Sequence, residues 1–269
     1  MENPTPSPSA YPTLYQGFGI LLLFFILSMG AGLFISLGHL SGSTVLMDWL
    51  KMVGYFLSAG GTLFVIARIK SRVNGEKTVL RSESTSPLNY LIVVILTFLA
   101  VVVIDPLTSL LPMPEDIREL FNQLFGLTIP AFITAVILAP VLEELIFRGI
   151  VLEGFLRNYS PVKAIFWTNV LFGLAHLNPW QFMGAFLMGI LISWVYYKTR
   201  NLLLPVLMHF VNNLGGFLFI YITRAPAAEA SLEDIFSSLL PYYILVITGA
   251  IILILFFWFS PKLFPVRQS

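Results

Sequence analysis

The chain has 269 residues, of which 57% are hydrophobic and only 11% charged, and its mean hydropathy is +0.87. A soluble domain carries about 25% charged residues, so a soluble globular protein is excluded and a membrane protein with several spans is predicted. The absence of cysteine excludes disulfides, thiolate metal sites and cysteine nucleophiles, and a net charge of +1 gives no indication of a nucleic-acid partner.

In chain order, a Pro- and Ser-rich segment over residues 1–13 comes first and is predicted to be a flexible tail. Eight apolar stretches follow that are long enough to cross a bilayer, which needs about 20 helical residues. They cover 14–38, 49–69, 88–111, 129–152, 162–178, 180–197, 202–222 and 240–260. The fifth and sixth are the shortest, so this pair is expected to be tilted or partly re-entrant. Residues 114–126 are predicted to form an amphipathic helix at the membrane interface.

The basic residues predict the orientation of the spans. With the amino terminus in the cytoplasm and eight alternating spans, twelve Lys and Arg fall inside and three outside. Cytoplasmic loops carry the excess of Lys and Arg in membrane proteins. We therefore predict an all-α bundle of about eight transmembrane helices, one domain over residues 14–262, with both termini cytoplasmic. The expected location is the plasma membrane of a bacterium or archaeon.

The fourth span contains three charged residues, Glu143, Glu144 and Arg148. Charges within a span cost several kcal/mol (~3) on insertion scales, so their presence indicates a role. Glu144 and Arg148 stand four residues apart with the acid first, the favourable order for an ion pair on a helix. Glu143 points about 100° away from Glu144 and has no partner on its own helix. A desolvated carboxylate of this kind accepts a proton readily, as a general base must.

Two histidines lie in later spans. His176 ends the run Phe172-Gly-Leu-Ala-His176, and His209 precedes Asn213 by one helical turn. Either histidine alone would be interpreted as a packed, hydrogen-bonded side chain. Together with Glu143 and a buried asparagine they favour one shared polar site.

These side chains suit the hydrolysis of an amide by activated water. The sequence has no Gly-x-Ser-x-Gly elbow, no phosphate-binding glycine loop and no His-Glu-x-x-His zinc helix. Glu143 would deprotonate the water, His176 would help to hold it, and His209 with Asn213 would donate to the developing oxyanion.

Three motifs in order, Glu-Glu-x-x-x-Arg, Phe-x-x-x-His and His-x-x-x-Asn, resemble the CPBP family of CAAX-processing and bacteriocin-processing intramembrane proteases, also called the Abi family. The resemblance covers about residues 125–220. It implies that Glu143 and His176 activate water and that His209 and Asn213 stabilise the oxyanion. Glu144, Arg148 and Phe172 occupy the supporting positions of the motifs.

The resemblance implies that the substrate is a membrane-embedded or lipid-anchored protein or peptide and that it is met within the lipid bilayer. The identity of the substrate stays open. Access is expected from the cytoplasmic half of the membrane, along walls formed by Phe147, Phe172, Trp167 and Phe210. No cofactor is expected. Zinc stays an alternative, in which Glu143, His176 and His209 would be the ligands.

Two rival functions are an ion- or proton-coupled transporter, whose spans also carry intramembrane charges, and a non-catalytic membrane scaffold. The transporter is disfavoured because no repeated halves are visible, and the scaffold because the set of four polar residues is complete. One feature conflicts with a shared site. If Arg148 and Lys163 mark cytoplasmic ends, the nominal depths of Glu143 and His176 differ by about 12 Å, which would require an interfacial start to the fifth helix or a displaced fourth helix.

Overall fold

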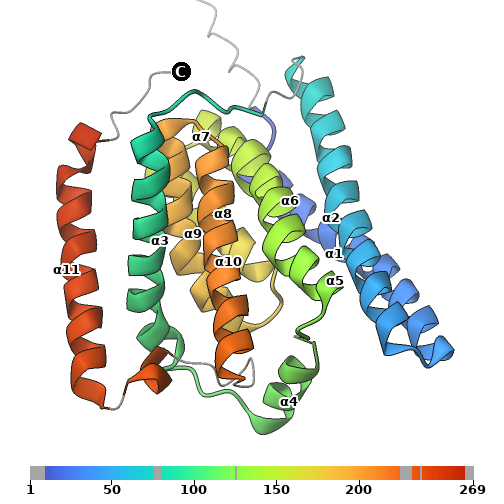
Figure 1. Cartoon of the computed structure of the whole chain (residues 1–269). Coiled ribbons are helices and arrows are strands. Elements are labelled where there is room, and N and C mark those ends of the chain that lie inside the picture. Colours follow the sequence, from blue (N-terminus) through green and yellow to red (C-terminus); the bar gives the residue numbers. More distant parts are fainter. Residues whose placement is uncertain (1–9, 76–79, 125, 225–231, 237, 264–269) are drawn as a thin grey trace, which may run out of the picture.

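A computed structural model of the chain describes residues 10–75, 80–124, 126–224, 232–236 and 238–263 (Figure 1). Apart from one β-bridge between Ser82 and Asn201, the regular structure of these residues is entirely helical, which confirms the all-α class. The elements are α1 (Leu14–Ser41), α2 (Thr44–Asn74), α3 (Pro87–Thr108), α4 (Glu115–Leu124), α5 (Ile129–Phe132), η1 (Ile133–Leu138), α6 (Ala139–Ile146), η2 (Phe147–Leu152), α7 (Glu153–Asn158), α8 (Pro161–Leu174), α9 (Pro179–Thr199), α10 (Leu203–Thr223), η3 (Leu232–Ile235) and α11 (Leu239–Leu263).

All eight predicted apolar stretches are helical, and in the described residues seven helices are long and apolar enough to cross a membrane. The remaining helix, α8, has 14 residues and is about 21 Å long, less than the ~30 Å of a hydrocarbon core. The chain then turns through residues 175–178 before α9 begins. The chain is thus a multi-pass integral membrane protein, with α4 as the predicted short amphipathic helix between the third and fourth spans.

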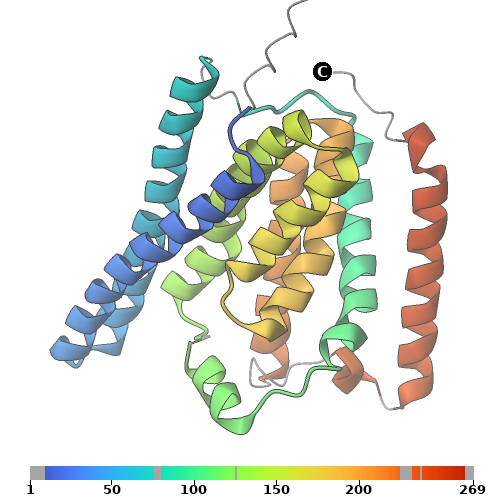
Figure 2. The same ribbon diagram turned by 180° about the vertical axis from the view of Figure 1, so that it is seen from behind.

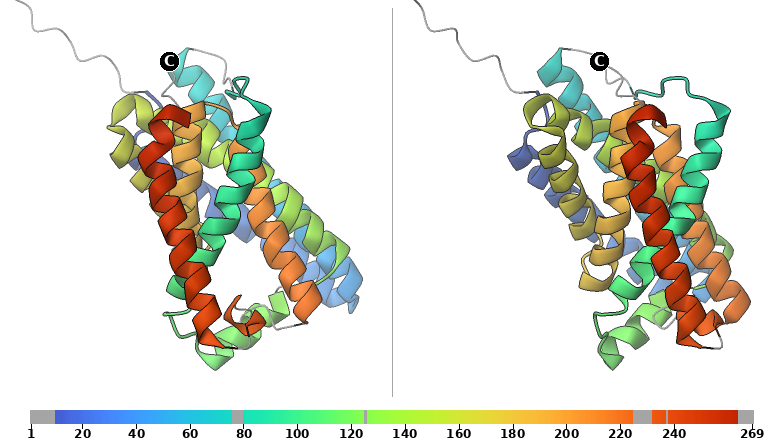
Figure 3. Two further views of the ribbon diagram at one scale, coloured as in Figure 1. Left: turned by 60° about the vertical axis from the view of Figure 1, so that its left-hand side comes forward. Right: turned by 90° about the vertical axis from the view of Figure 1, so that its left-hand side faces the viewer.

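The helices form one bundle with α1 and α2 as a paired hairpin on one flank and α11 on the other (Figures 1 and 2). In the middle, α3 contacts α9 and α10, and α8 pairs with α9. Helix α11 lies at the outer edge against α3 (Figure 3). The start of α1 and the end of α11 lie at the same end of the bundle (Figure 1). Which end faces the cytoplasm stays a prediction.

The fourth span is longer than predicted. It runs without a break from Ile129 to Asn158 through five consecutive segments, two of which, η1 and η2, are π-helical turns. Arg148 therefore does not mark the cytoplasmic end of the span: its side chain is completely buried, ten residues before the helix ends. Without Arg148, eleven Lys and Arg fall on the predicted cytoplasmic side and three on the outer side, so the predicted orientation does not change.

This longer helix removes the conflict in depth between Glu143 and His176. Glu143 lies 15 residues before the end of the span at Asn158 (158 − 143), and His176 lies 15 residues after the start of α8 at Pro161 (176 − 161). Because both helix ends meet at the same short turn, the two side chains reach the same level of the bundle. Neither of the two distortions that the sequence suggested is needed.

The chain before α1 is anchored from residue 10 onward, whereas residues 1–9 lie outside the described structure. The backbone N–H of Ala10 donates to Oδ1 of Asn158 at 3.1 Å, and that of Tyr11 donates to Oδ1 of Asn74 at 3.0 Å. Tyr11 is buried, and burial raises its pKa to about 12. The predicted flexible tail thus does not extend to residues 10–13, because they bind the ends of α2 and α7.

Candidate active site

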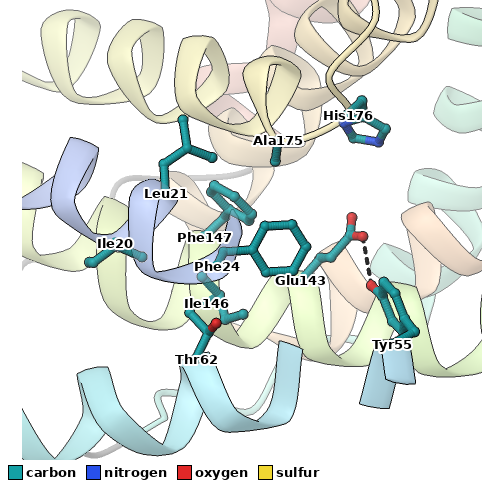
Figure 4. A pocket seen from close by; sticks show the side chains of 10 residues that line it. All are labelled: Ile20, Leu21, Phe24, Tyr55, Thr62, Glu143, Ile146, Phe147, Ala175 and His176. Atoms are coloured by element: carbon teal, nitrogen blue, oxygen red, sulfur yellow. Dashed lines mark hydrogen bonds between the residues drawn. The ribbon is translucent and has the colours of Figure 1, made fainter. Parts of the chain in front are cut away.

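Glu143 lies on α6 and has a partner that the sequence did not reveal. The hydroxyl of Tyr55, on α2, donates to Oε1 of Glu143 at 2.7 Å (Figure 4). The other carboxylate oxygen, Oε2, is 4.0 Å from Nε2 of His209 on α10. The interpretation of Glu143 as an unpaired acid is therefore wrong, because it considered partners on the same helix only. The carboxylate is held between two other helices, with its side chain 17% exposed.

Glu144 and Arg148 form the predicted ion pair, with 3.0 Å between Oε1 and Nη1 and no exposure of either side chain. The guanidinium also donates to Oγ of Ser193, Oδ1 of Asn169 and the carbonyl of Gly189, at 3.0–3.2 Å. A buried charge is tolerated when its hydrogen-bonding groups are satisfied. Arg148 therefore ties α6 and η2 to α8 and α9 at the centre of the bundle.

Phe172 lies among the polar residues and contacts three of them. Its ring is under the guanidinium of Arg148 at 4.7 Å and is edge-to-face with the rings of His176 and His209 at 5.2 and 5.8 Å. An arginine over an aromatic face is attracted by the ring quadrupole. The side chain therefore sets the separation between the two histidines, which explains why an aromatic residue suits this position.

Both histidines have one ring nitrogen engaged. Nδ1 of His176 is 2.9 Å from the carbonyl oxygen of Phe172, and Nδ1 of His209 is 2.8 Å from Oε1 of Glu144. A carbonyl oxygen only accepts, so Nδ1 of His176 carries the hydrogen and Nε2 of the neutral ring is a proton acceptor. The bond from His209 joins Glu144 to the site directly, so Glu144 orients a histidine as well as pairing with Arg148.

Asn213 follows His209 by one turn of α10. Its Nδ2 donates to the carbonyl of Ala135 on η1 at 2.8 Å, and its Oδ1 accepts from Nδ2 of Asn212 at 3.0 Å. The amide is thus attached to the backbone of the helix that carries Glu143, two turns before that residue. Of the four residues predicted to act, Glu143 and His176 line one cavity, His209 faces Glu143, and Asn213 lies beside them on α10.

The cavity next to Glu143 has a volume of about 170 Å³ and mainly apolar walls (Figure 4). Its polar lining residues are Tyr55, Thr62, Glu143 and His176, and its apolar ones are Ile20, Leu21, Phe24, Ile146, Phe147 and Ala175.

Of the four aromatic walls predicted, Phe147 lines this cavity. Phe172 packs behind it with ring centroids 5.1 Å apart, Trp167 instead packs on Phe18, and Phe210 is not a lining residue. Helix α1 supplies Ile20, Leu21 and Phe24 in their place, which the sequence gave no reason to expect.

The candidate ligands of a metal ion are Glu143, His176 and His209. The described part of the chain contains no group of three or more His, Asp or Glu side chains placed to hold one. One premise of the metal-free prediction is nevertheless wrong. A metal-free site is predicted on the premise that few groups on the motif helices can accept a hydrogen bond from a ligating imidazole, yet Glu144 and the Phe172 carbonyl contact His209 and His176.

Residues 125–215 match the family model described as type II CAAX prenyl endopeptidase, Rce1-like. The resemblance to the CAAX protease family is confirmed for this segment. All seven residues of the three motifs lie inside it, between Glu143 and Asn213.

Two of three curated relatives carry the name of a membrane protease or peptidase. The chain is 34% identical over 108 residues to the membrane-embedded CAAX protease MroQ of Staphylococcus aureus, over 37% of this chain and 42% of the relative. It is 37% identical over 92 residues to an uncharacterized 24.3 kDa protein of Escherichia coli, over 32% and 42%. It is 27% identical over 81 residues to the putative membrane peptidase YdiL of Bacillus subtilis, over 30% and 33%. The chain thus covers less than half the length of each relative, and no solved structure matches it.

Proposed function

We propose that this protein is an intramembrane endopeptidase that hydrolyses a peptide bond of a membrane-associated substrate. The observation that carries the proposal is the meeting of Glu143 and His176 in one apolar cavity, with His209 facing the same carboxylate. The match of residues 125–215 to a CAAX endopeptidase family supports it.

In the proposed reaction a water molecule lies between Glu143 and His176. Glu143 takes one proton from the water, whose oxygen bonds to the carbonyl carbon of the substrate. The same proton then passes to the nitrogen of the leaving amine, and the C–N bond breaks. Nε2 of His176 accepts a hydrogen bond from the water and aligns it. No covalent enzyme intermediate is required.

The oxyanion of the tetrahedral intermediate would be held by His209 and Asn213. Nδ1 of His209 is held by Glu144, so Nε2 is the nitrogen that would donate to the oxyanion, with a hydrogen on both ring nitrogens. In the described structure one Nδ2 hydrogen of Asn213 goes to Ala135, which orients the amide and leaves the other for the oxyanion.

The walls of the cavity favour a substrate with an apolar segment. Six of the ten lining side chains are the apolar Ile20, Leu21, Phe24, Ile146, Phe147 and Ala175. A membrane-embedded or lipid-anchored protein or peptide fits these walls. We propose no metal in any step, since no group of three ligands is assembled among the described residues.

The test is a comparison of membrane proteomes from cells that produce the wild type or Glu143→Gln. Wild-type cells should contain a new peptide terminus that the variant lacks. On a peptide that spans this cleavage site, the rate of hydrolysis by Glu143→Gln should be lower than that of the wild type by orders of magnitude. Asn213→Ala should lower kcat by about 100-fold, the usual effect of losing one oxyanion donor. Glu115→Gln, in the exposed first turn of α4, is the matched control.

The outcomes separate the rival functions. Wild-type activity in Glu143→Gln would remove Glu143 from the reaction, and the absence of any Glu143-dependent terminus would favour the transporter or scaffold. The purified protein should keep its activity after exhaustive chelation. One zinc ion per active chain, with activity lost on its removal and restored on its return, would overturn the metal-free mechanism.

A further inference from the structure

Tyr55 lies outside the family-matched segment and donates a hydrogen bond to the proposed general base. It lies on α2, 88 residues before Glu143, and its hydroxyl makes a short bond of 2.7 Å to Oε1. The preceding Gly54 packs against Ala31 of α1, with 3.1 Å between an added Cβ and the Ala31 side chain. This close packing of the two helices fixes the position from which Tyr55 reaches α6.

Tyr55 also separates two cavities. One is the apolar cavity of about 170 Å³ that contains Glu143 and His176. The other has about 470 Å³ and lies toward the start of α2, where Thr44, Asp48 and Lys51 line it together with Thr134 of η1. Tyr55 is the only residue common to the two linings. The larger cavity lies at the end of α2 opposite to Arg68, Lys70 and Arg72, so it is not on the side from which the sequence predicts access.

We infer that Tyr55 is a positioning residue for the proposed hydrolysis, with its hydroxyl fixing the Glu143 carboxylate and its ring closing the catalytic cavity against the larger one. This inference rests on the proposed function. It adds a fifth functional residue, contributed by a helix that carries none of the three motifs.

The hydroxyl acts on the orientation of the carboxylate. The terminal torsion of a glutamate is broad and nearly two-fold, so rotation about it costs little. A bond from Tyr55 to Oε1 stops this rotation and leaves Oε2 toward His209 and the cavity. The hydroxyl also satisfies one oxygen of a carboxylate that has lost most of its water. Tyr55 thus selects the oxygen that meets the attacking water.

The ring acts on the volume available to substrate. Beside Glu143 the walls are apolar, whereas the larger cavity contains the Asp48–Lys51 ion pair, with 3.2 Å between its charged atoms. An apolar segment that enters the catalytic cavity ends against the ring of Tyr55. Tyr55→Phe removes the hydroxyl and keeps this wall, whereas Tyr55→Ala removes both and joins the two cavities.

The first experiment measures kinetics on the peptide segment that carries the Glu143-dependent terminus. Tyr55→Phe should lower kcat by about 10- to 100-fold, the effect of losing one hydrogen bond to a charged group, and should change KM less than 2-fold. Because Tyr55 acts through Glu143, the double variant with Glu143→Gln should be no slower than Glu143→Gln alone. Tyr196→Phe, which removes another buried Tyr–Glu bond at 2.8 Å, is the control and should leave kcat unchanged.

The ring is tested on the same segment with enlarged apolar side chains beside the cleaved bond. Tyr55→Ala should cleave the enlarged segments that the wild type and Tyr55→Phe reject. Equal rejection by all three proteins would overturn the role of the ring.

A second measurement needs no activity. In purified protein, Tyr55→Phe and Glu143→Gln should each lower the unfolding temperature, and the double variant should lower it no further than the larger single effect. Additive losses would overturn the inference. If the losses in unfolding temperature are coupled but no Glu143-dependent cleavage is found, the contact between Tyr55 and Glu143 is supported and the proposed function is overturned instead. Coupled losses together with full activity in Tyr55→Phe would overturn the positioning role alone.

Discussion

Arg148 carries the positive charge that lies deepest in the described structure, and four acceptors surround it. Three of them come from other helices, the Asn169 and Ser193 side chains and the Gly189 carbonyl. Breaking a buried pair by removing one partner costs about 3–5 kcal/mol, because the remaining charge keeps its desolvation penalty. Glu144 is that remaining charge, with one carboxylate oxygen, Oε2, without a hydrogen-bond partner in the described structure.

Arg148→Met should therefore lower the free energy of unfolding by about 3–5 kcal/mol. The double variant Arg148→Met/Glu144→Gln should recover part of this loss, because no uncompensated carboxylate remains. Chemical unfolding in detergent micelles measures both values. Arg118→Met is the control, since its pair with Glu115 is largely exposed and contributes about 1 kcal/mol or less. Equal stabilities of the single and double variants would show that the charge of Glu144 is not the cause.

The pair itself could be predicted from the spacing of Glu144 and Arg148, because both stand on one helix and helical periodicity fixes their neighbourhood. The bonds to Asn169 and Ser193 could not, because they depend on how three helices pack. Tyr55 escaped notice for the same reason. Its position in an apolar helix gives no local signal that its hydroxyl meets an acid 88 residues away.

At the scale of the elements, α9 approaches the Arg148 cluster closely at Gly189. A Cβ at this position would overlap Oδ1 of Asn169 and lie 3.1 Å from Nη2 of Arg148. Neither group can move without losing a hydrogen bond to the other, since Nη2 donates to Oδ1 at 3.0 Å. The absence of a side chain at Gly189 is what allows α8, α9 and η2 to meet.

Gly189→Ala should lower the free energy of unfolding by about 1–3 kcal/mol, the usual cost of overpacking a core. Gly184→Ala is the control on the same helix, because its Cβ would meet Thr108 at an ordinary contact distance of 3.7 Å. Helix propensity alone favours both substitutions. A thermal shift in detergent measures the difference, and equal unfolding temperatures for the two variants would refute the close-packing argument.

The ends of the fourth span show where prediction of elements fails. Hydropathy predicts its start at residue 129 but an end six residues too early, at residue 152. The nominal depths also rest on Arg148 as a marker of the cytoplasmic end. A fully satisfied guanidinium does not need water, so the helix continues. The π turns at η1 and η2 also left no signal, since the pattern of apolar residues does not specify single inserted residues.

For the molecule as a whole, both termini are predicted to be cytoplasmic, and the absence of cysteine makes this simple to test. Ser84 and Ser109 are exposed and flank opposite ends of α3. In intact cells, an impermeant maleimide should label Ser109→Cys but should label Ser84→Cys only after the membrane is opened. The reverse pattern would invert the topology. Labelling of both sites in intact cells would show that α3 does not span the membrane.

The dispersal of the Arg148 acceptors along the chain has a consequence for biogenesis. Asn169 and Ser193 follow Arg148 by 21 and 45 residues, so neither has entered the membrane when Arg148 leaves the ribosome. Until both have entered, Glu144 alone offsets a charge that is costly in hydrocarbon. The span should therefore wait beside the translocon and enter the lipid together with the α8–α9 hairpin. In chains arrested before residue 193, a photo-crosslinker placed in the fourth span should accordingly react with the translocon, and in longer chains it should react with lipid.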